Sequence, residues 1–519
     1  MKRPDLLKKI ERLSAIGIDL SVQKDLNQLL ETILTGAKEL TGADAGTLYL
    51  YKEDKFLHFE IVFADSMNLA MGGKSGNPVT MAPVPLYDES GNPNRRNVVS
   101  YAALENRVVN IEDAYTNKDY DFSGTRKFDE KSGYRSKSFL SVPMRDHEDK
   151  LIGVLQLINP IDAETGEIVS FTAEDEKLVA SLGSQAAVAL TRKILIDGLE
   201  NLLQSLVKLV ATAIDEKSPY TGGHCKRVPE LTMLLAKAVN AETEGCYAGV
   251  ELNEQELHEL EMAAWLHDCG KITTPEYVVD KRTKLETIFD RIHLVDARLD
   301  LLALAAEDSP QAPPLSPDEL AEIRAFLHQV NSGGEFLSPE KAERIRELAQ
   351  LPLPGNNDKS ATLLTDDEVR NLCISKGTLT DDERDKIQQH IVSTIQMLEA
   401  LPFPQHLQQV PAIAGAHHER LDGKGYPRGL TAENLSLQAR MLALADIFEA
   451  LTASDRPYRT PVKLSKALTI VGQMSQEGHV DPDLYRLFVE RRLYDSYART
   501  YFIDEQIDEV DPKALPGLS

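Results

Sequence analysis

The chain has 519 residues, of which 42% are hydrophobic and 27% are charged, a composition that indicates an ordinary folded protein and excludes a disordered or fibrous one. The length is enough for roughly two to four domains. The formal net charge is −25, which argues against a general nucleic-acid or anionic-membrane binder, because either would need a basic surface. An anionic small substrate stays compatible with this charge if metal ions and a few cationic side chains supply local positive charge.

No apolar run approaches the ~20 residues of a membrane span, and the charged start of the chain, Met1 to Asp5, has no signal-peptide core. The cysteines form no CxxC pair and no dense framework, which predicts reduced thiols. They are Cys225, Cys246, Cys269 and Cys373. We therefore expect a cytoplasmic protein without a membrane or nucleic-acid partner.

The first part of the chain changes from a helical to a β-type pattern. Apolar residues recur at three- and four-residue steps over 5–40, which predicts helices. Four β-type runs follow in two pairs, each pair split by a polar turn: 46–51 with 56–62, and 138–144 with 151–159. We expect an N-terminal helix over 1–25 and an α+β domain over 26–190, in which helices flank an antiparallel sheet.

A long helix is predicted next. The helical period returns at Thr172 and continues to about Lys217 almost without a break, and Thr172 with Asp175 gives a plausible N-terminal cap. A helix this long leaves one domain and enters the next, so we assign 191–205 to a linker helix. Its apolar stripe predicts pairing with a second copy in a homodimer; packing within the monomer is the alternative.

Segments of the α+β domain resemble the GAF family of small-molecule sensor domains. These are Asp113-Ala114-Tyr115, Gly133-Tyr134-Arg135-Ser136-Lys137-Ser138, Val142-Pro143-Met144 and the run from Ile152 to Asn159. The GAF subset that binds cyclic nucleotides carries a signature that is similar here at Asn159, Phe171, Asp175 and Glu176, whereas Pro160 stands where a Lys is expected. The resemblance implies a cyclic nucleotide as one hypothesis for the GAF ligand. The alternative is another ligand, or a domain used only to dimerise.

The second half of the chain is predicted to be mostly helical, with no strand alternation over 200–500. We expect an all-α domain over 206–500. Patches rich in Pro, Gly and Asn interrupt the helical segments of 280–376, which we interpret as an insertion rather than a separate core. We expect 501–519 to be a tail that frays after Pro512.

One stretch of this half, from Ala263 to Lys271, places two metal-binding side chains side by side. Adjacent helix residues point about 100° apart, so His267 and Asp268 cannot both chelate one ion from one face. A carboxylate that bridges two ions, with the imidazole serving one of them, fits better. The alternative is a core histidine followed by an ordinary aspartate at a helix end.

Further metal-binding side chains recur beyond this pair. His224 starts a predicted helix, His390 lies on another, and His417 and His418 end a third. Asp446 lies in an otherwise apolar helix, where burying an unpaired carboxylate is costly and metal coordination would relieve the cost. A mixed set of imidazoles and carboxylates suits iron, manganese, nickel or zinc.

These segments occur in order and together resemble the HD-GYP subfamily of HD phosphohydrolases over about 200–275 and 375–480. The family is helical and hydrolyses cyclic di-GMP at a metal cluster. The resemblance therefore implies a phosphodiesterase that releases pGpG and/or GMP under control of the GAF domain. Hydrolysis of another cyclic dinucleotide, such as cyclic GMP-AMP, and a non-enzymatic signalling or binding module are the rival hypotheses.

Carried over residue by residue, the resemblance implies these metal ligands: His224, His267, Asp268, His390, His417, His418 and Asp446. It gives Asp268 and Lys271 the catalytic roles, with Lys271 beside the substrate phosphate. The other substrate-binding residues that it implies are Gly425, Tyr426, Pro427, Arg456 and Arg459.

The sequence departs from the family at two places. Members with three metals use a Glu four residues before the first ligand His, and Tyr220 stands there; we therefore expect two ions, iron or manganese. The insertion separates Lys271 from His390, and His293 lies nearer the usual family distance from His267. The segments that flank His390 still resemble the family, so we prefer His390 as the ligand.

Overall fold

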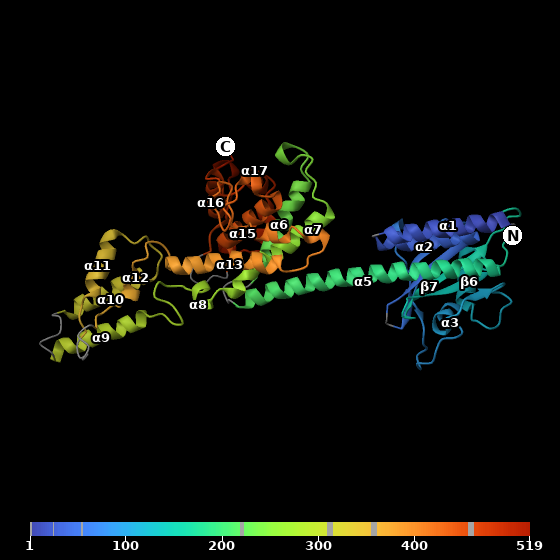
Figure 1. Ribbon diagram of the computed structural model, residues 1–519, viewed down its shortest axis with the longest axis horizontal. Helices are drawn as coiled ribbons and strands as arrows, with labels where there is room; N and C mark the ends of the chain where they lie inside the picture. The colour runs from blue at the N-terminus through green and yellow to red at the C-terminus, as the bar shows by residue number, and fades with distance from the viewer. Residues whose placement is uncertain are drawn as a thin grey trace. The chain divides into compact units, whose positions relative to one another are not determined.

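The computed structural model describes residues 3–23, 25–52, 55–217, 223–308, 315–353, 361–454 and 461–518. The chain divides into two compact units, 1–202 and 203–519 (Figure 1). The boundary falls inside one long helix, α5 (Ala173–Lys217). Among the described residues we find no helix that combines the length and the apolarity needed to cross a bilayer.

The first unit is built on an antiparallel sheet with the order β3-β2-β1-β7-β6-β5, and β4 pairs with β2. Its strands are β1 (Ala43–Tyr51), β2 (Phe56–Ala64), β3 (Leu69–Gly72), β4 (Val84–Pro85), β5 (Val109–Ile111), β6 (Phe139–Arg145) and β7 (Leu151–Pro160). Both predicted strand pairs, β1 with β2 and β6 with β7, are confirmed.

Helices cover both faces of this sheet (Figure 1). They are α1 (Arg3–Val22), α2 (Leu26–Thr41), α3 (Val98–Glu105) and the first part of α5, and the unit also contains α4 (Ser123–Ser132). Leu34 of α2, Leu155 of β7 and Leu182 of α5 share one buried cluster, to which α1 also contributes, and α3 packs against the other face. The predicted cap of α5 is confirmed, because Asp175 N–H donates to the Thr172 hydroxyl at 3.2 Å.

The second unit is helical, as predicted. Its helices outside the insertion are α6 (His224–Asn240), α7 (Glu254–Leu266), α8 (Glu276–Val279), α13 (Asp381–Glu399), α14 (Val410–Ala414), α15 (Leu437–Thr452), α16 (Leu464–Gln476), α17 (Pro482–Glu490) and α18 (Leu493–Tyr501). The last turns of α5 belong to the same core through Val207, Ala211 and Ile214.

The expectation that 280–376 lacks a core of its own is wrong. This insertion forms α9 (Ile292–Asp308), α10 (Pro317–Asn331), α11 (Pro339–Ala349) and α12 (Asp366–Leu372), whose apolar faces share a separate buried cluster that includes Leu299, Leu327 and Ile345. The apolar faces of these four helices pack on one another. The patches rich in Pro, Gly and Asn lie in the connections between the helices, where they do not prevent a core.

The prediction that the chain frays after Pro512 is also wrong. Leu515 is buried in the core of the second unit. Upstream in the same segment, Gln506 is buried and its Nε2 donates to the carbonyl of Thr452 at 2.8 Å. The segment 501–519 is rich in polar residues, but a few of its side chains are buried against the second unit. Its local composition does not reveal this packing.

Candidate metal centre

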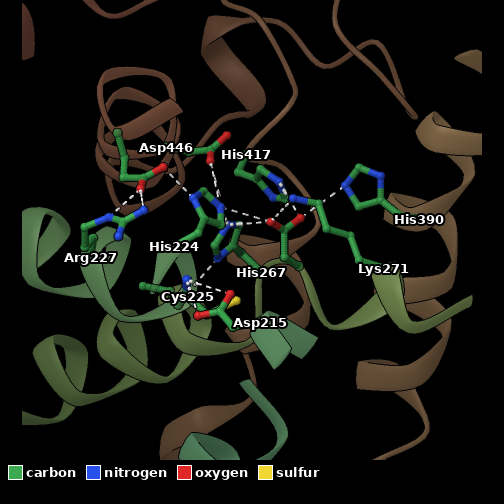
Figure 2. A network of polar contacts seen from close by, with 12 residues as sticks. Asp215, His224, Cys225, Arg227, His267, Lys271, His390, His417 and Asp446 are labelled. Carbon is green, nitrogen blue, oxygen red and sulfur yellow. Dashed lines mark hydrogen bonds and ion pairs between the residues drawn. The ribbon is translucent and has the colours of Figure 1, made fainter. Parts of the chain in front are cut away.

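Segments that lie far apart in the sequence bring the predicted ligands to one place (Figure 2). Two triplets of side chains each have ligand atoms within 4.8 Å of one another. The first triplet is His224, His267 and Asp268, and the second triplet is His390, His417 and His418. Asp446 of α15 adjoins the first triplet, with Oδ1 3.4 Å from His224 Nε2 and 3.8 Å from His267 Nε2.

Asp268 lies between the histidines of the two triplets and turns one oxygen toward each histidine group. Its Oδ2 lies 3.1 Å from His224 Nε2 and 3.2 Å from His267 Nε2. Its Oδ1 lies 3.2 Å from His390 Nε2 and 3.9 Å from His417 Nε2. Ligands bonded to one ion at about 2.1 Å are about 3.0 to 3.4 Å apart when the bond angles lie between about 90° and 109°. The separations on the Oδ2 side, and that between Oδ1 and His390, therefore suit a carboxylate that bridges two ions.

The orientation of three histidines is fixed by their second ring nitrogen. In His267, His390 and His417, Nδ1 lies within hydrogen-bond distance of the backbone carbonyl three residues earlier. A carbonyl only accepts, so each Nδ1 carries a proton and each Nε2 points toward the centre, where its unprotonated form can bind a metal ion. Metal-binding histidines are commonly held in this way.

Three buried polar atoms that face this centre lack a hydrogen-bond partner among the described residues. Within the described part of the chain, His390 Nε2, His417 Nε2 and Asp268 Oδ1 are buried and have no hydrogen-bond partner. Buried polar atoms of this kind are rare because each costs free energy. A cation among them would satisfy all of these atoms at once, so the residues fit a metal centre.

A buried carboxylate that the sequence analysis missed holds the remaining first-triplet histidine. Glu449 Oε2 lies 2.5 Å from His224 Nδ1, and Glu449 Oε1 lies 2.6 Å from Arg227 Nη2. Burial alone would raise the pKa of Glu449, but His224 and Arg227 lower it to about 2. The available signal was a second carboxylate on the same apolar helix, three residues after Asp446 and thus on the same face.

The pKa shifts of His417, His418 and Asp268 suit metal binding. Burial and the neighbouring His267 lower the pKa of His417 to about 4. Burial and His417 lower the pKa of His418 well below its usual value. Burial opposes ionisation of Asp268, but Lys271 and His267 hold its pKa well below its ordinary value. Neutral imidazoles and an ionised carboxylate are the forms that bind a metal ion.

The pKa of His224 is shifted the other way. Burial alone would lower it, but Glu449 and Asp268 raise it to about 10 in the metal-free protein. The proton on Nε2 therefore takes the place of a cation there, and metal binding would release it. Beside this site, Lys271 Nζ lies 2.5 Å from Asp268 Oδ2, and its side chain is 26% exposed. Lys271 thus places a cation at the rim of the centre, and its contact with a phosphate stays a prediction.

The predicted substrate loop begins beside the second triplet. The ring of Tyr426 lies 4.9 Å from that of His418, with 34° between the ring planes, and Pro427 follows through a cis peptide bond. A Cβ on Gly425 would lie 2.4 Å from Glu419 Cα, so only glycine fits. The Gly-Tyr-Pro order therefore lets the backbone approach closely enough to bring the tyrosine ring to the centre.

Three of the residues discussed from the sequence lie outside the described residues: Arg456, Arg459 and Tyr220. The structure distinguishes the two candidates for the ligand after Lys271. His390 lies in the second triplet, whereas the side chain of His293 is exposed on α9 and belongs to neither triplet.

The four residues predicted to bind a GAF ligand make contacts within their own domain. Asn159 Oδ1 accepts two backbone N–H groups, at 2.8 and 3.1 Å, and Phe171 is buried in the core. Asp175 Oδ2 accepts the N–H of Thr172 at 3.0 Å, and Glu176 Oε1 accepts a hydrogen bond from Asn110 Nδ2 at 2.8 Å. Their role in binding a ligand stays a prediction.

Comparison with known families agrees with this architecture. Residues 25–190 match the family model described as GAF domain. Residues 221–351 and 360–484 match two family models that are both described as HD domain. The chain therefore combines an N-terminal GAF domain with an HD domain.

Curated relatives define the type of HD domain. The chain is 40% identical over 119 residues to "3'3'-cGAMP-specific phosphodiesterase 3" of Vibrio cholerae, covering 22% of this chain and 25% of the relative. It is 40% identical over 114 residues to "Cyclic di-GMP phosphodiesterase PA4108" of Pseudomonas aeruginosa, covering 22% of this chain and 26% of the relative. The chain thus spans about a quarter of the length of these two relatives.

A solved GAF domain from an Acinetobacter phosphoenolpyruvate-protein phosphotransferase is 15% identical and covers 37% of this chain and 98% of that one, with a TM-score of 0.27. Together with the family matches, the curated relatives show that the HD domain of this chain is of the HD-GYP type.

Proposed function

We propose that this protein is a metal-dependent phosphodiesterase that hydrolyses cyclic di-GMP to pGpG and/or GMP. The observation that carries the proposal is the position of Asp268, whose two oxygens face separate histidine groups at distances that suit two bridged ions. The first triplet with Asp446 would hold one ion, and the second triplet with Asp268 the other. We expect iron or manganese.

The chemistry divides between the ions and the chain. Two divalent ions held there would lower the pKa of a water and offset negative charge on the phosphoryl group. Asp268 and the histidines fix the spacing of the two positions. Lys271, already beside Asp268 Oδ2, would turn its ammonium toward a phosphate oxygen, where a preorganised cation stabilises the developing charge. Tyr426, beside His418, would hold the adjoining nucleotide.

Cyclic GMP-AMP is the second candidate substrate. The relative from Vibrio cholerae is named as specific for 3'3'-cGAMP, and it is as similar to this chain as the relative named for cyclic di-GMP. Identity at this level therefore does not separate the two substrates, and parallel assays with both nucleotides are needed.

We also propose that the chain is a homodimer that pairs through α5, and that the GAF domain controls activity through this helix. Exposed leucines at alternating four- and three-residue steps support the pairing, because this spacing forms the seam of a coiled coil. They are Leu195, Leu199, Leu202, Leu206 and Leu209. Leu199→Glu combined with Leu206→Glu should give a monomer in analytical ultracentrifugation, and a dimer unchanged by this double variant would contradict the pairing.

The test of the activity uses the full chain purified without oxygen. Metal content per chain is measured, cyclic di-GMP or cyclic GMP-AMP is added, and the products are separated by chromatography. About two ions per chain with release of pGpG or GMP, both reduced in Asp268→Asn and retained in the exposed control Asp504→Asn, would support the proposal. If the protein binds metal but cleaves only cyclic GMP-AMP, the proposed substrate changes to cyclic GMP-AMP. If it neither binds metal nor cleaves either nucleotide, the result favours a binding module.

A further inference from the structure

The helix α6, which carries the first predicted metal ligand, has no N-cap side chain. His224 is the first residue of α6, and Gly223 stands before it with φ 86° and no side chain to accept the free N–H groups. Asp215, near the end of α5, supplies the missing acceptor. Its Oδ2 accepts the N–H of Gly223 at 3.0 Å and that of Cys225 at 3.2 Å (Figure 2). A carboxylate at a helix N-terminus satisfies orphan donors and interacts favourably with the helix dipole.

Lys217, the last residue of α5, holds the segment that follows Asp268. Lys217 Nζ donates to the carbonyls of Ile272 and Thr274, both at 2.7 Å, and to that of Lys271 at 3.2 Å. An ammonium has three donors, so these contacts use all of them. The three carbonyls end the short helix that starts directly after Asp268, over Cys269–Thr273.

We propose that Asp215 and Lys217 are positioning residues of the metal centre. Asp215 fixes the backbone on both sides of His224, and Lys217 fixes the backbone that follows Asp268 and carries Lys271. The two residues lie two positions apart on the last turn of α5, so one helical segment sets the spacing between a histidine of the first triplet and the bridging carboxylate. The contacts of both side chains given above are to backbone groups, so each residue acts through the backbone.

The same contacts give α5 a specific connection to the centre. The helix starts at Ala173, and Leu182 and Ala186 lie in the core of the first unit, whereas Ile214 lies in the core of the second. Any displacement of the last turn of α5 moves Asp215 and Lys217 together. It therefore shifts the hydrogen bonds to the segments that carry His224 and Lys271 at the same time. The centre therefore depends on the position of this turn.

The experiment measures the affinity of the full chain for Mn²⁺ by competition with a chelator, alongside kcat and KM for cyclic di-GMP. Asp215→Asn and Lys217→Met should each weaken Mn²⁺ binding about 10-fold, since indirect supports of metal ligands have effects of about 10- to 100-fold. Lys217→Arg keeps the charge and donors and should restore most of the affinity. The loss of activity should fall on kcat more than on KM, because neither substitution removes a side chain that is proposed to bind substrate.

Two matched controls change the same charges elsewhere. Glu216→Gln alters the exposed residue between the two positioning residues, and Lys237→Met alters an exposed lysine of α6; both should bind Mn²⁺ as the unaltered chain does. Affinities of Asp215→Asn and Lys217→Met within twofold of the unaltered chain would overturn the proposal. If Asp215→Asn does not fold, the comparison of Lys217→Met with Lys217→Arg decides, and equal losses in both would overturn it.

The kinetic part rests on the proposed function, but the Mn²⁺ affinity does not. A chain that binds two ions without cleaving cyclic di-GMP would contradict the proposed function and leave the affinity test of Asp215 and Lys217 intact.

Discussion

Replacing Glu449 by Gln tests the metal centre at a residue that binds no ion itself. The carboxylate lies 2.5 Å from His224 Nδ1 and 2.6 Å from Arg227 Nη2, and its pKa is lowered to about 2 from the ordinary 4.5. A shift of that size corresponds to about 3 kcal/mol in favour of the ionised form. We therefore expect Glu449→Gln to destabilise the metal-free protein by about 3 kcal/mol at pH 7 and to weaken Mn²⁺ binding about 10- to 100-fold.

The stability effect has a defined dependence on pH. The folded pKa of Glu449 is lower than the unfolded one, so its stabilisation is present above about pH 4.5 and is lost as the pH falls toward 2. Urea unfolding of the metal-free chain at pH 7 and at pH 3 should show a smaller difference between Glu449→Gln and the unaltered chain at the lower pH. Glu433→Gln, at an exposed position, is the control. Equal Mn²⁺ affinity and equal urea midpoints at pH 7 for Glu449→Gln and the unaltered chain would refute the reasoning.

Three further predictions follow from individual contacts. His390→Ala should lose the ion of the second triplet, whereas His293→Ala, altered at an exposed side chain, should keep both ions by metal analysis. Gly425→Ala forces a Cβ to within 2.4 Å of backbone, so it should reduce kcat/KM for cyclic di-GMP while the metal content stays near that of the unaltered chain. Lys281→Met leaves Glu383 without its fully buried cationic partner, so it should destabilise the fold by about 3–5 kcal/mol, seen as a lower melting transition in calorimetry.

Each of these predictions can fail in a specific way. Two retained ions in His390→Ala would remove this histidine from the ligand set, and one lost ion in His293→Ala would contradict the assignment. Unchanged kinetics in Gly425→Ala would show that the loop tolerates a side chain. A melting temperature of Lys281→Met equal to that of the unaltered chain would show that the buried ion pair contributes little.

The sequence determined the secondary structure where apolar periodicity was strong. Apolar residues at every second position predicted the strand pairs, and apolar residues at every third or fourth position predicted the long helix. These spacings follow from which side of a strand or helix is buried. The free-energy cost of burying an unpaired carboxylate also indicated, from the sequence alone, that Asp446 belongs to a metal site. The same cost of burial applies to Glu449, three residues further along the same helix.

The tertiary structure decided which residues meet. The separate core of 280–376 depends on several short helices that pack on one another, and no single segment shows this in its sequence. The choice between His390 and His293 likewise depends on the return of the chain after that insertion. The roles of Glu449, Asp215 and Lys217 rest on contacts with other segments of the chain. The distance between these segments in the sequence does not predict such contacts. Periodicity reports which face of an element is buried, and only the packed chain shows what that face is buried against.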